Sequence, residues 1–273
     1  FTNLTQDHLD YHKTMKNYQE AKGKLFNKSF TKKAIINRDD ESHQYFLDNA
    51  SDKDPITFGL DDLEFFKNSE NGFICQLNNY VFELPLVGEF NLSNVMAAYQ
   101  SVKCLGYSDD QIIPFLAKLS PPPGRMQQLE NSHIWIDYAH TPDALDNALS
   151  TLRKHYPEFK IRVIFGCGGD RDKGKRQIMG KIASERADSM ILTNDNPRSE
   201  DPQSIVDDIL AGTKVENDVQ VILDRGDAIK SAIQTLSEEE ALLIAGKGHE
   251  TTQVIGSKTH QFSDVEVALN ALN

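Results

Sequence analysis

Cysteine is scarce in this sequence. The 273 residues include three, Cys75, Cys104 and Cys167, which lie far apart and form no C-x-x-C pair. This spacing excludes a disulfide framework and a zinc knuckle. It is typical of a reducing compartment, so we expect a cytoplasmic protein in which the three thiols are small buried side chains.

Positive charge is also in deficit. The chain has 29 Lys and Arg against 41 Asp and Glu, which gives a net charge of −12. An acidic chain repels phosphate backbones unless its positive charge is concentrated locally, so we do not expect nucleic acid as a partner.

Long apolar runs are missing as well. Runs such as Ala241–Ala245 are far too short to cross a bilayer, so no membrane association is expected. No basic and apolar leader opens the chain, which predicts that it is not exported. The chain starts at Phe1 without Met, and we interpret this as a sign of a fragment or a processed protein.

The composition is that of an ordinary globular protein, with 39% apolar and 26% charged residues. At ~150 residues per domain, the length is enough for about two domains. The stretch Ser120-Pro-Pro-Pro-Gly124 interrupts both helix and strand. We therefore predict one domain over residues 1–120 and a second over residues 121–273.

The first domain is predicted to mix helix and sheet. Apolar residues recur near a period of 3.6 in Thr14–Phe26, and a second helix is predicted from Asn91 or Ser93 up to Gly106, a normal C-terminal glycine. Short apolar runs separated by turn residues such as Asn78-Asn79 indicate sheet between the helices. The predicted strands are Ala34–Asn37, Ile56–Gly59, Gly72–Leu77 and Tyr80–Leu86.

The second domain alternates strand, loop and helix. This rhythm predicts an α/β fold with a doubly wound, mostly parallel, Rossmann-like sheet and helices on both of its faces. The predicted strands are Ile134–Tyr138, Ile161–Phe165, Met190–Thr193, Val219–Leu223 and Leu242–Ala245.

Polar segments, two of them rich in glycine, follow four of these strands. In such folds ligands bind beyond the carboxyl ends of the strands, so we expect the four loops to face one crevice. The segments are Asp137-Tyr-Ala-His140, Gly166-Cys-Gly-Gly-Asp-Arg171, Asn194-Asp-Asn-Pro-Arg198 and Gly246-Lys-Gly-His-Glu250.

One of these loops imitates two nucleotide-binding motifs without completing either. Gly169–Lys175 has the spacing of a phosphate loop, but Arg176 stands where Ser or Thr must bind Mg²⁺. The glycines from Gly166 onward begin a dinucleotide fingerprint that ends in Arg171 instead of glycine. Neither kind of site is therefore expected there.

Positive charge gathers in the same loop, at Arg171, Lys173, Lys175 and Arg176. One interpretation is a solvated helix start. The other is an anion-recognition loop, in which glycine allows close backbone approach and arginine contacts carboxylate or phosphate. Its position at a strand end favours the second interpretation.

Short segments along nearly the whole chain follow an order typical of one enzyme family. They are Thr2–Asp10, Ala21-Lys22, Gly88–Asn94, Gly124–Met126, Asp137–Asp143, Gly166–Arg176, Asp195–Arg198 and Gly246–Glu250. In this order they resemble the Mur ligase family, and within it the tripeptide synthetases that add the third residue to UDP-N-acetylmuramoyl-L-Ala-D-Glu.

The resemblance implies an ATP-dependent amide ligase of peptidoglycan precursor synthesis. ATP phosphorylates a carboxylate, and the acceptor amine attacks the acyl phosphate through a tetrahedral intermediate. The family's Gly-Thr-x-Gly-Lys-Thr-Thr phosphate loop, its N-terminal domain and the first part of its central domain have no counterpart in this sequence. Residues 1–120 would be the later part of an α/β ATP-binding central domain, residues 121–273 the C-terminal acceptor-binding domain, and the chain alone would be inactive.

By the same resemblance, Lys22 is carbamylated in the complete enzyme and helps to hold Mg²⁺, and His8 contacts this metal. In this chain, where the phosphate loop has no counterpart, we expect Lys22 to be unmodified. On one continuous helix the 14 residues between His8 and Lys22 would span ~21 Å. The chain must therefore turn between them, and we expect the helix to begin near Thr14. His12 would be a structural group, and Leu9 in place of a glutamate excludes a zinc-protease helix.

The resemblance assigns four residues to ATP. Asn94 would read adenine and Asp137 would hold the ribose hydroxyls, while Arg125 and His140 would serve phosphate or ribose. An aspartate at a strand end is otherwise often a helix cap, but Thr141-Pro142 already provides that cap.

For the acceptor amino acid the resemblance points to Arg171, Asp195, Asn196, Pro197, Arg198, Gly246 and Glu250. Meso-diaminopimelate carries a carboxylate and an ammonium at its distal end, so its pocket needs an arginine fork and acidic partners together. L-Lysine lacks the distal carboxylate and would leave Arg198 unpaired. Arg198 therefore favours diaminopimelate.

The expected partners are ATP with Mg²⁺, UDP-N-acetylmuramoyl-L-Ala-D-Glu and meso-diaminopimelate, bound by a monomer. Three alternatives stay open: a lysine-adding tripeptide synthetase, a folylpolyglutamate-synthetase-like ligase and a non-catalytic nucleotide-binding module. The segments Asp195–Arg198 and Gly246–Glu250 speak against the folylpolyglutamate-synthetase-like ligase.

Overall fold

The computed structural model describes residues 1–27, 30–69, 72–129, 132–214 and 218–273. These residues form two units, Phe1–Ser120 and Pro121–Asn273, each with an apolar core of its own.

The second unit contains one six-stranded sheet in the order β10-β9-β8-β11-β7-β6. Its strands pair in parallel, except that β6 runs antiparallel to β7. Each of the five predicted strands of this unit is confirmed to within two residues. The strands are β6 (Gln127–Gln128), β7 (Ile134–Asp137), β8 (Lys160–Phe165), β9 (Ser189–Leu192), β10 (Asp218–Val221) and β11 (Glu240–Ala245).

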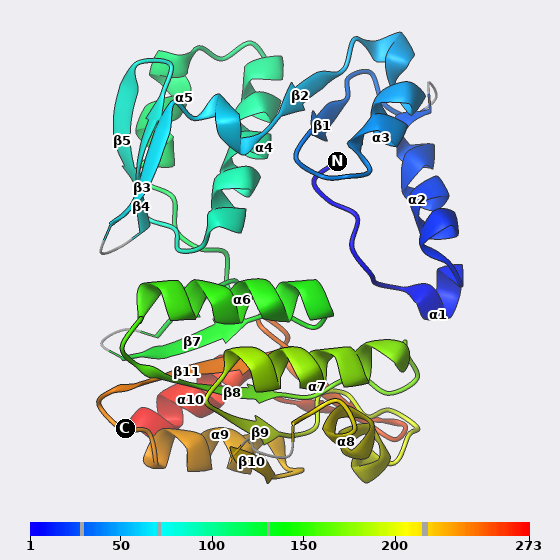
Figure 1. Cartoon of the computed structure of the whole chain (residues 1–273), viewed down its shortest axis with the longest axis vertical. Helices are drawn as coiled ribbons and strands as arrows, with labels where there is room; N and C mark the ends of the chain where they lie inside the picture. Colours follow the sequence, from blue (N-terminus) through cyan, green and yellow to red (C-terminus); the bar gives the residue numbers. More distant parts are fainter. Residues whose placement is uncertain (28–29, 70–71, 130–131, 215–217) are drawn as a thin grey trace. The chain divides into compact units, whose positions relative to one another are not determined.

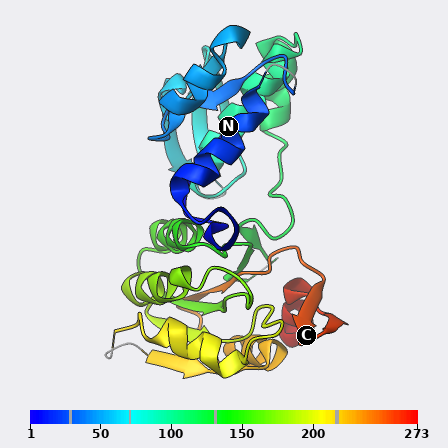
Figure 2. The same ribbon diagram turned by 90° about the vertical axis from the view of Figure 1, so that its right-hand side faces the viewer.

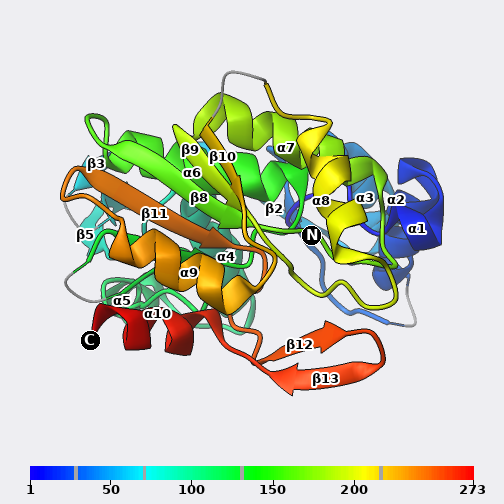
Figure 3. The same cartoon turned by 90° about the horizontal axis from the view of Figure 1, so that it is seen from below.

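Helices cover both faces of this sheet, as the alternating pattern predicts. On one face lie α6 (Pro142–His155), α7 (Gly174–Arg186) and α8 (Pro202–Leu210), and on the other α9 (Arg225–Gln234) and α10 (Asp264–Leu272) (Figure 1, Figure 3). Figure 2 shows the red α10 across the sheet from the green helices. Side chains cap four of these helices by accepting a backbone N–H, and the caps are Thr141, Asp201, Asp224 and Ser263.

The sheet is apolar on both faces because helices cover both. All six residues of β11 are buried. Alternate residues of β7 and β11 pack with the inward faces of α9 and α10 in one cluster, which includes Ile134, Ile136, Leu242, Ile244, Ala228, Ile229 and Ala268.

Strand β11 lies between β7 and β8, and this order matters for binding. The helices that follow β7 and β8 cover one face, whereas α10, which follows β11, covers the other (Figure 3). The chain therefore leaves β11 toward one face of the sheet, but leaves its two neighbours, β7 and β8, toward the opposite face. Such switch points open crevices at the carboxyl ends of the strands, where ligands bind in open α/β sheets.

A small hairpin, β12 (Thr252–Ile255) and β13 (Lys258–Gln261), stands apart from the main sheet (Figure 3). The sequence pattern did not predict this hairpin, because the four residues of β13 are polar and exposed and show no alternation of apolar side chains.

The first unit joins short helices to two small sheets. Its helices are α1 (Leu9–His12), α2 (Met15–Gly23), α3 (His43–Asn49), α4 (Glu89–Cys104) and α5 (Asp109–Leu116), with 3-10 turns at Lys24–Phe26, Ser51–Lys53 and Leu60–Asp62. The parallel pair β1 (Ile35–Asn37) and β2 (Ile56–Phe58) is separate from the antiparallel sheet of β3 (Phe65–Ser69), β4 (Gly72–Leu77) and β5 (Tyr80–Leu84).

Local signals in this unit are confirmed, with one correction. Asn78 and Asn79 both adopt positive φ, at 48° and 69°, as a two-residue hairpin turn requires. The predicted helix start at Asn91 or Ser93 is wrong: α4 begins at Glu89, because Gly88, with φ 95°, ends the preceding loop and an acidic residue suits the first turn. The helix does end before Gly106, whose φ is 93°.

Candidate functional site

The four loops predicted to face one crevice contact one another at the carboxyl edge of the sheet. Gly246 N–H donates to the Asp137 carbonyl oxygen at 3.1 Å, and Gly169 N–H donates to the Asn196 carbonyl oxygen at 2.9 Å. The Asn196 side-chain amide donates to Glu250 Oε2 at 3.1 Å. These bonds connect the loops after β7, β11, β9 and β8, so the predicted convergence is confirmed.

Glycine is required where the loops after β8 and β9 meet. A Cβ at Gly166 would lie 2.0 Å from the carbonyl oxygen of Thr193, and one at Gly169 would lie 1.9 Å from that of the buried Pro197. Only glycine allows two backbones to approach this closely.

A buried lysine holds the glutamate of the loop after β11. Lys247 is fully buried, and its Nζ donates to Glu250 Oε2 at 2.7 Å and to Asn196 Oδ1 at 3.3 Å. Burial alone would raise the pKa of Glu250, but the contacts with Lys247 and Asn196 and the charge of Arg198 lower it overall. Glu250 is therefore a carboxylate at neutral pH. The sequence motif predicted Glu250 as a site residue, but it gave no such indication for Lys247, three residues earlier.

The side chains of Arg171 and Arg198 both lie close to Gly168. Arg198 is half-buried and donates through Nη1 to the Gly169 carbonyl oxygen at 2.8 Å, while Arg171 is exposed. A Cβ at Gly168 would lie 2.9 Å from Nη1 of Arg198 and 3.6 Å from Cγ of Arg171. The two side chains predicted to bind acceptor carboxylates are thus neighbours.

Asp195, in the loop after β9, lies against the loop after β11. It is buried, and a Cβ at Gly246, where φ is 113°, would lie 2.8 Å from its Oδ2. The structure therefore brings the seven predicted acceptor residues to one edge of one sheet, with acidic and basic groups side by side.

The rest of the basic loop serves the protein itself. Arg176 is fully buried and donates to Glu200 at 2.9 and 3.0 Å and to Asp208 at 2.9 Å, and Lys173 pairs with Glu200 at 3.0 Å. The hydrogen bond from Arg176, with the neighbouring donors, lowers the pKa of Glu200 to about 2. The predicted anion recognition by this loop then rests on Arg171.

Arg225 is a further buried cation that sequence analysis missed. Its guanidinium makes a bidentate pair with Asp264 at 2.7 and 2.8 Å. It also donates to the carbonyl oxygens of Ala245, at 2.9 Å, and Asn194, at 3.4 Å. One side chain thus connects the end of β11 to the residue that precedes Asp195.

Asp137 ends β7 and is buried. Its Oδ2 accepts the N–H of Met126 and its Oδ1 that of Ala139, both at 2.7 Å. Burial raises the pKa of Asp137 more than these bonds and the charges of Arg125 and His140 lower it.

Arg125 and His140 both lie against Tyr138. The guanidinium carbon of Arg125 is 4.6 Å from the ring centroid, and the His140 ring is 4.5 Å away. Lys175 Nζ donates to the His140 carbonyl oxygen at 2.8 Å. The residues predicted for ATP in this unit therefore form one group beside the loop after β7.

In the first unit, the turn predicted between His8 and Lys22 is confirmed. Thr14 caps α2 by accepting the N–H of Asn17 at 3.1 Å, and His8 precedes the separate single turn α1. Lys22 Nζ lies 5.2 Å from the ring centroid of Tyr18, and the His8 ring lies 6.0 Å from it. The two residues predicted to serve the metal therefore flank one tyrosine.

The amine of Lys22 is easier to deprotonate than that of an ordinary lysine. Burial lowers its pKa, against the opposing charges of Asp40 and Asp7. Carbamylation needs the neutral amine, so this shift favours it. His12 stacks on Tyr18 at 5.0 Å and 21°, in keeping with the structural role expected of it.

A complete set of metal ligands is not assembled: within the part of the chain that the structure describes, no group of three His, Cys, Asp or Glu gathers. Mg²⁺ usually keeps several waters and takes phosphate oxygens, so His8 and a carbamate on Lys22 fit as a partial set. Asn94, predicted for adenine, is exposed on α4 and donates to Asn91 Oδ1 at 3.3 Å.

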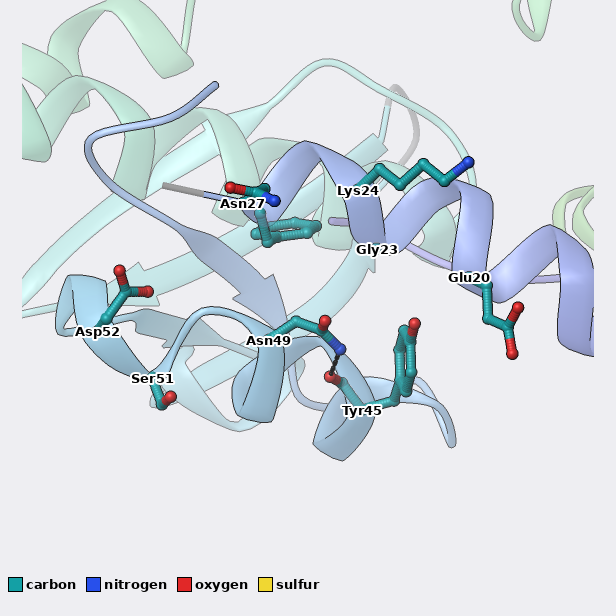
Figure 4. Close-up of a pocket in the computed structure, with 9 residues that line it drawn as sticks. Glu20, Gly23, Lys24, Asn27, Tyr45, Asn49, Ser51 and Asp52 are labelled. Atoms are coloured by element: carbon teal, nitrogen blue, oxygen red, sulfur yellow. Dashed lines mark hydrogen bonds between the residues drawn. The ribbon is translucent and has the colours of Figure 1, made fainter. Parts of the chain in front are cut away.

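A hollow of about 500 Å³ opens beside α2 and α3 (Figure 4). None of the predicted site residues lines it, although Glu20 and Lys24 belong to the same helical segment as Lys22. Its lining is Glu20, Gly23, Lys24, Phe26, Asn27, Tyr45, Asn49, Ser51 and Asp52.

Residues 1–102 match the Mur ligase middle domain, and residues 124–248 match the Mur ligase, glutamate ligase domain. The chain belongs to the Mur ligase family. No helix among the described residues has both the length and the apolar character needed to cross a membrane.

Two curated relatives share the same name. A UDP-N-acetylmuramoyl-L-alanyl-D-glutamate--2,6-diaminopimelate ligase of Rickettsia rickettsii is 42% identical over 98% of this chain and 58% of its own length. A protein of the same name from Synechocystis sp. is 41% identical over 100% and 57%. The chain thus spans well under two thirds of these curated relatives.

Solved structures agree on the fold. One titled as a UDP-N-acetylmuramoyl-L-alanyl-D-glutamate--2,6-diaminopimelate ligase is 36% identical, with a TM-score of 0.60 over 99% of this chain and 59% of its own. A folylpolyglutamate synthase of Mycobacterium tuberculosis, 19% identical, has a TM-score of 0.69 over 89% and 60%, a likeness of fold alone.

Proposed function

We propose that this chain is part of an ATP-dependent ligase that adds meso-diaminopimelate to UDP-N-acetylmuramoyl-L-Ala-D-Glu in peptidoglycan precursor synthesis. The observation that carries the proposal is the pair Arg171 and Arg198 beside Gly168, at the same sheet edge as Asp195 and Glu250. The names of the curated relatives support the same acceptor.

The acceptor would be held by charge at its distal end. An arginine fork suits a carboxylate, and Arg198 is already oriented by its bond to the Gly169 carbonyl oxygen. Glu250, ionised at neutral pH, and Asp195 suit an ammonium group. An amino acid with only one of these distal groups leaves a charge unpaired at the site, which costs affinity.

The proposed reaction has two steps. The γ-phosphoryl group of ATP passes to the substrate carboxylate and gives ADP and an acyl phosphate. The acceptor amine then attacks the carbonyl carbon, a C–N bond forms, the C–O bond to phosphate breaks, and the amine loses a proton. Positioning and charge stabilisation dominate such chemistry.

For the nucleotide, the proposal keeps the roles that the resemblance implies. Arg125, Asp137 and His140 would contact phosphate or ribose, and Asn94 would contact adenine. Mg²⁺ would neutralise charge on the phosphates, with a carbamate on Lys22 and His8 among its ligands. A cytoplasmic monomer is part of the proposal, and three free cysteines suit a reducing compartment.

Calorimetry on the purified chain tests the acceptor directly. With ATP and Mg²⁺ present, meso-diaminopimelate should bind, whereas L-lysine and L-glutamate should bind at least tenfold more weakly, about 1.4 kcal/mol. Equal binding of L-lysine would favour the lysine-adding alternative, and preferential binding of L-glutamate would favour the folylpolyglutamate-synthetase-like alternative. No binding of any of the three would contradict the proposal.

A further inference from the structure

The hairpin β12–β13 runs alongside the loop that ends in Arg198. Arg198 N–H donates to the Val254 carbonyl oxygen at 3.1 Å, and Gly256 N–H donates to the Arg198 carbonyl oxygen at 2.7 Å, so Arg198 forms a parallel bridge with Ile255. Arg198 has a φ of 51°, a left-handed conformation that non-glycine residues adopt at a cost. These two bonds help to hold the backbone in that conformation.

Gln253 extends this contact from the backbone to a side chain. Its Nε2 donates to the Asp195 carbonyl oxygen at 2.8 Å. The next residue, Val254, donates its N–H to Asn196 Oδ1 at 2.9 Å. Strand β12 therefore reaches three of the predicted acceptor residues, namely Asp195, Asn196 and Arg198.

Gln253 is unusual within the hairpin. It is 7% exposed, and it is the one buried residue of the two strands. A buried side chain on a strand is ordinarily apolar, and burying a side-chain amide costs free energy unless the amide is hydrogen-bonded. Its bond to the Asp195 carbonyl oxygen thus accounts for a glutamine at this position.

We propose that Gln253 is a positioning residue for acceptor binding. It fixes the segment Asp195–Arg198 against β12, so that the Arg198 guanidinium and the Asp195 carboxylate keep the separation that the acceptor requires. The identity of the acceptor rests on the proposed function, whereas the contact between hairpin and loop does not depend on it.

The test removes the donor and keeps the volume, with Gln253→Met, and with Gln253→Glu as a second variant in case the first does not fold. Amide hydrogen exchange of Val254 and Arg198 should become about five- to tenfold faster, as expected for the loss of one net hydrogen bond. Calorimetry should find meso-diaminopimelate bound about five- to tenfold more weakly, with ATP binding unchanged.

Gln261→Met is the matched control, because it makes the same substitution at an exposed position of the same hairpin. It should change neither exchange nor binding. Unchanged exchange at Val254 and Arg198 in both Gln253 variants would overturn the proposal, as would equally faster exchange throughout β7 and β11. If exchange behaves as expected but the wild-type chain binds no diaminopimelate, the proposed function fails while the positioning of the loop is supported.

Discussion

At the scale of single residues, we expect Arg198 to decide which acceptor amino acid binds. Its guanidinium is oriented by the Gly169 carbonyl oxygen and lies beside Arg171. Arg198→Ala should lose ~2–5 kcal/mol of diaminopimelate recognition, the usual range for unpairing a buried charge. It should also erase the preference over L-lysine, measured by calorimetry. Arg186→Ala, at an exposed surface pair with Asp146, is the control and should bind normally.

Lys22 is the second residue with a distinct expectation. Because burial lowers its pKa, more of its amine is neutral near pH 8 than in an ordinary lysine. In ¹³C-bicarbonate, NMR should detect a carbamate carbon in a full-length protein that includes the phosphate loop and in its Lys24→Ala variant, an exposed neighbour, but neither in its Lys22→Ala variant nor in the present chain. A carbamate signal that persists in Lys22→Ala would contradict the assignment.

Glu200 should make the stability of the second unit against unfolding depend on pH in the acid range. Its pKa is lowered from 4.5 to about 2, chiefly by Arg176. A carboxylate whose pKa is lower in the folded state than in the unfolded state stabilises the fold at a pH above its unfolded-state pKa. This stabilisation is lost as the pH falls through its folded-state pKa. The urea concentration at the unfolding midpoint should therefore decrease as the pH is lowered from about 4.5 toward 2. The Glu200→Gln variant should have a lower urea midpoint than wild type at pH 7, and its midpoint should depend less on pH in the acid range.

At the scale of elements, the loops after β8 and β9 fit only if Gly169 stays a glycine. A Cβ there would lie 1.9 Å from the Pro197 carbonyl oxygen, so Gly169→Ala should destabilise the second unit by ~1–3 kcal/mol. Gly174→Ala is the control: its nearest neighbour would be Asp172 Oδ1 at 3.2 Å, and alanine suits the start of α7. Equal urea midpoints for the two variants would refute the close approach.

At the scale of the molecule, the second unit closes its own core. The whole six-stranded sheet and the five helices that cover it lie within residues 121–273. A protein of these residues alone should therefore unfold in one cooperative urea transition and keep the circular dichroism of an α/β fold. A gradual transition, or binding of hydrophobic dyes by this protein at neutral pH, would contradict a self-sufficient core.

Sequence alone determined much of the local structure. Thr141 was recognised as a helix cap because a cap acts on amides two or three residues away. The helix start near Thr14 was recognised because apolar residues recur near a period of 3.6 from that point on. The five strands of the second unit were recognised because apolar runs between polar loops are readable without knowing the fold. The convergence of Asp137, Asp195 and Gly246 followed from one rule, that parallel strands point their carboxyl ends to the same edge.

Tertiary structure alone decided which charged side chains serve the protein and which are left for a ligand. Arg171 and Arg176 stand five residues apart in one basic run, yet Arg171 is exposed while Arg176 is buried against Glu200. Arg225 and Gln253 gave no signal in sequence, since their partners Asp264 and Asp195 lie 39 and 58 residues away. Burial and pairing over such separations depend on how the whole chain packs, and no local pattern encodes them.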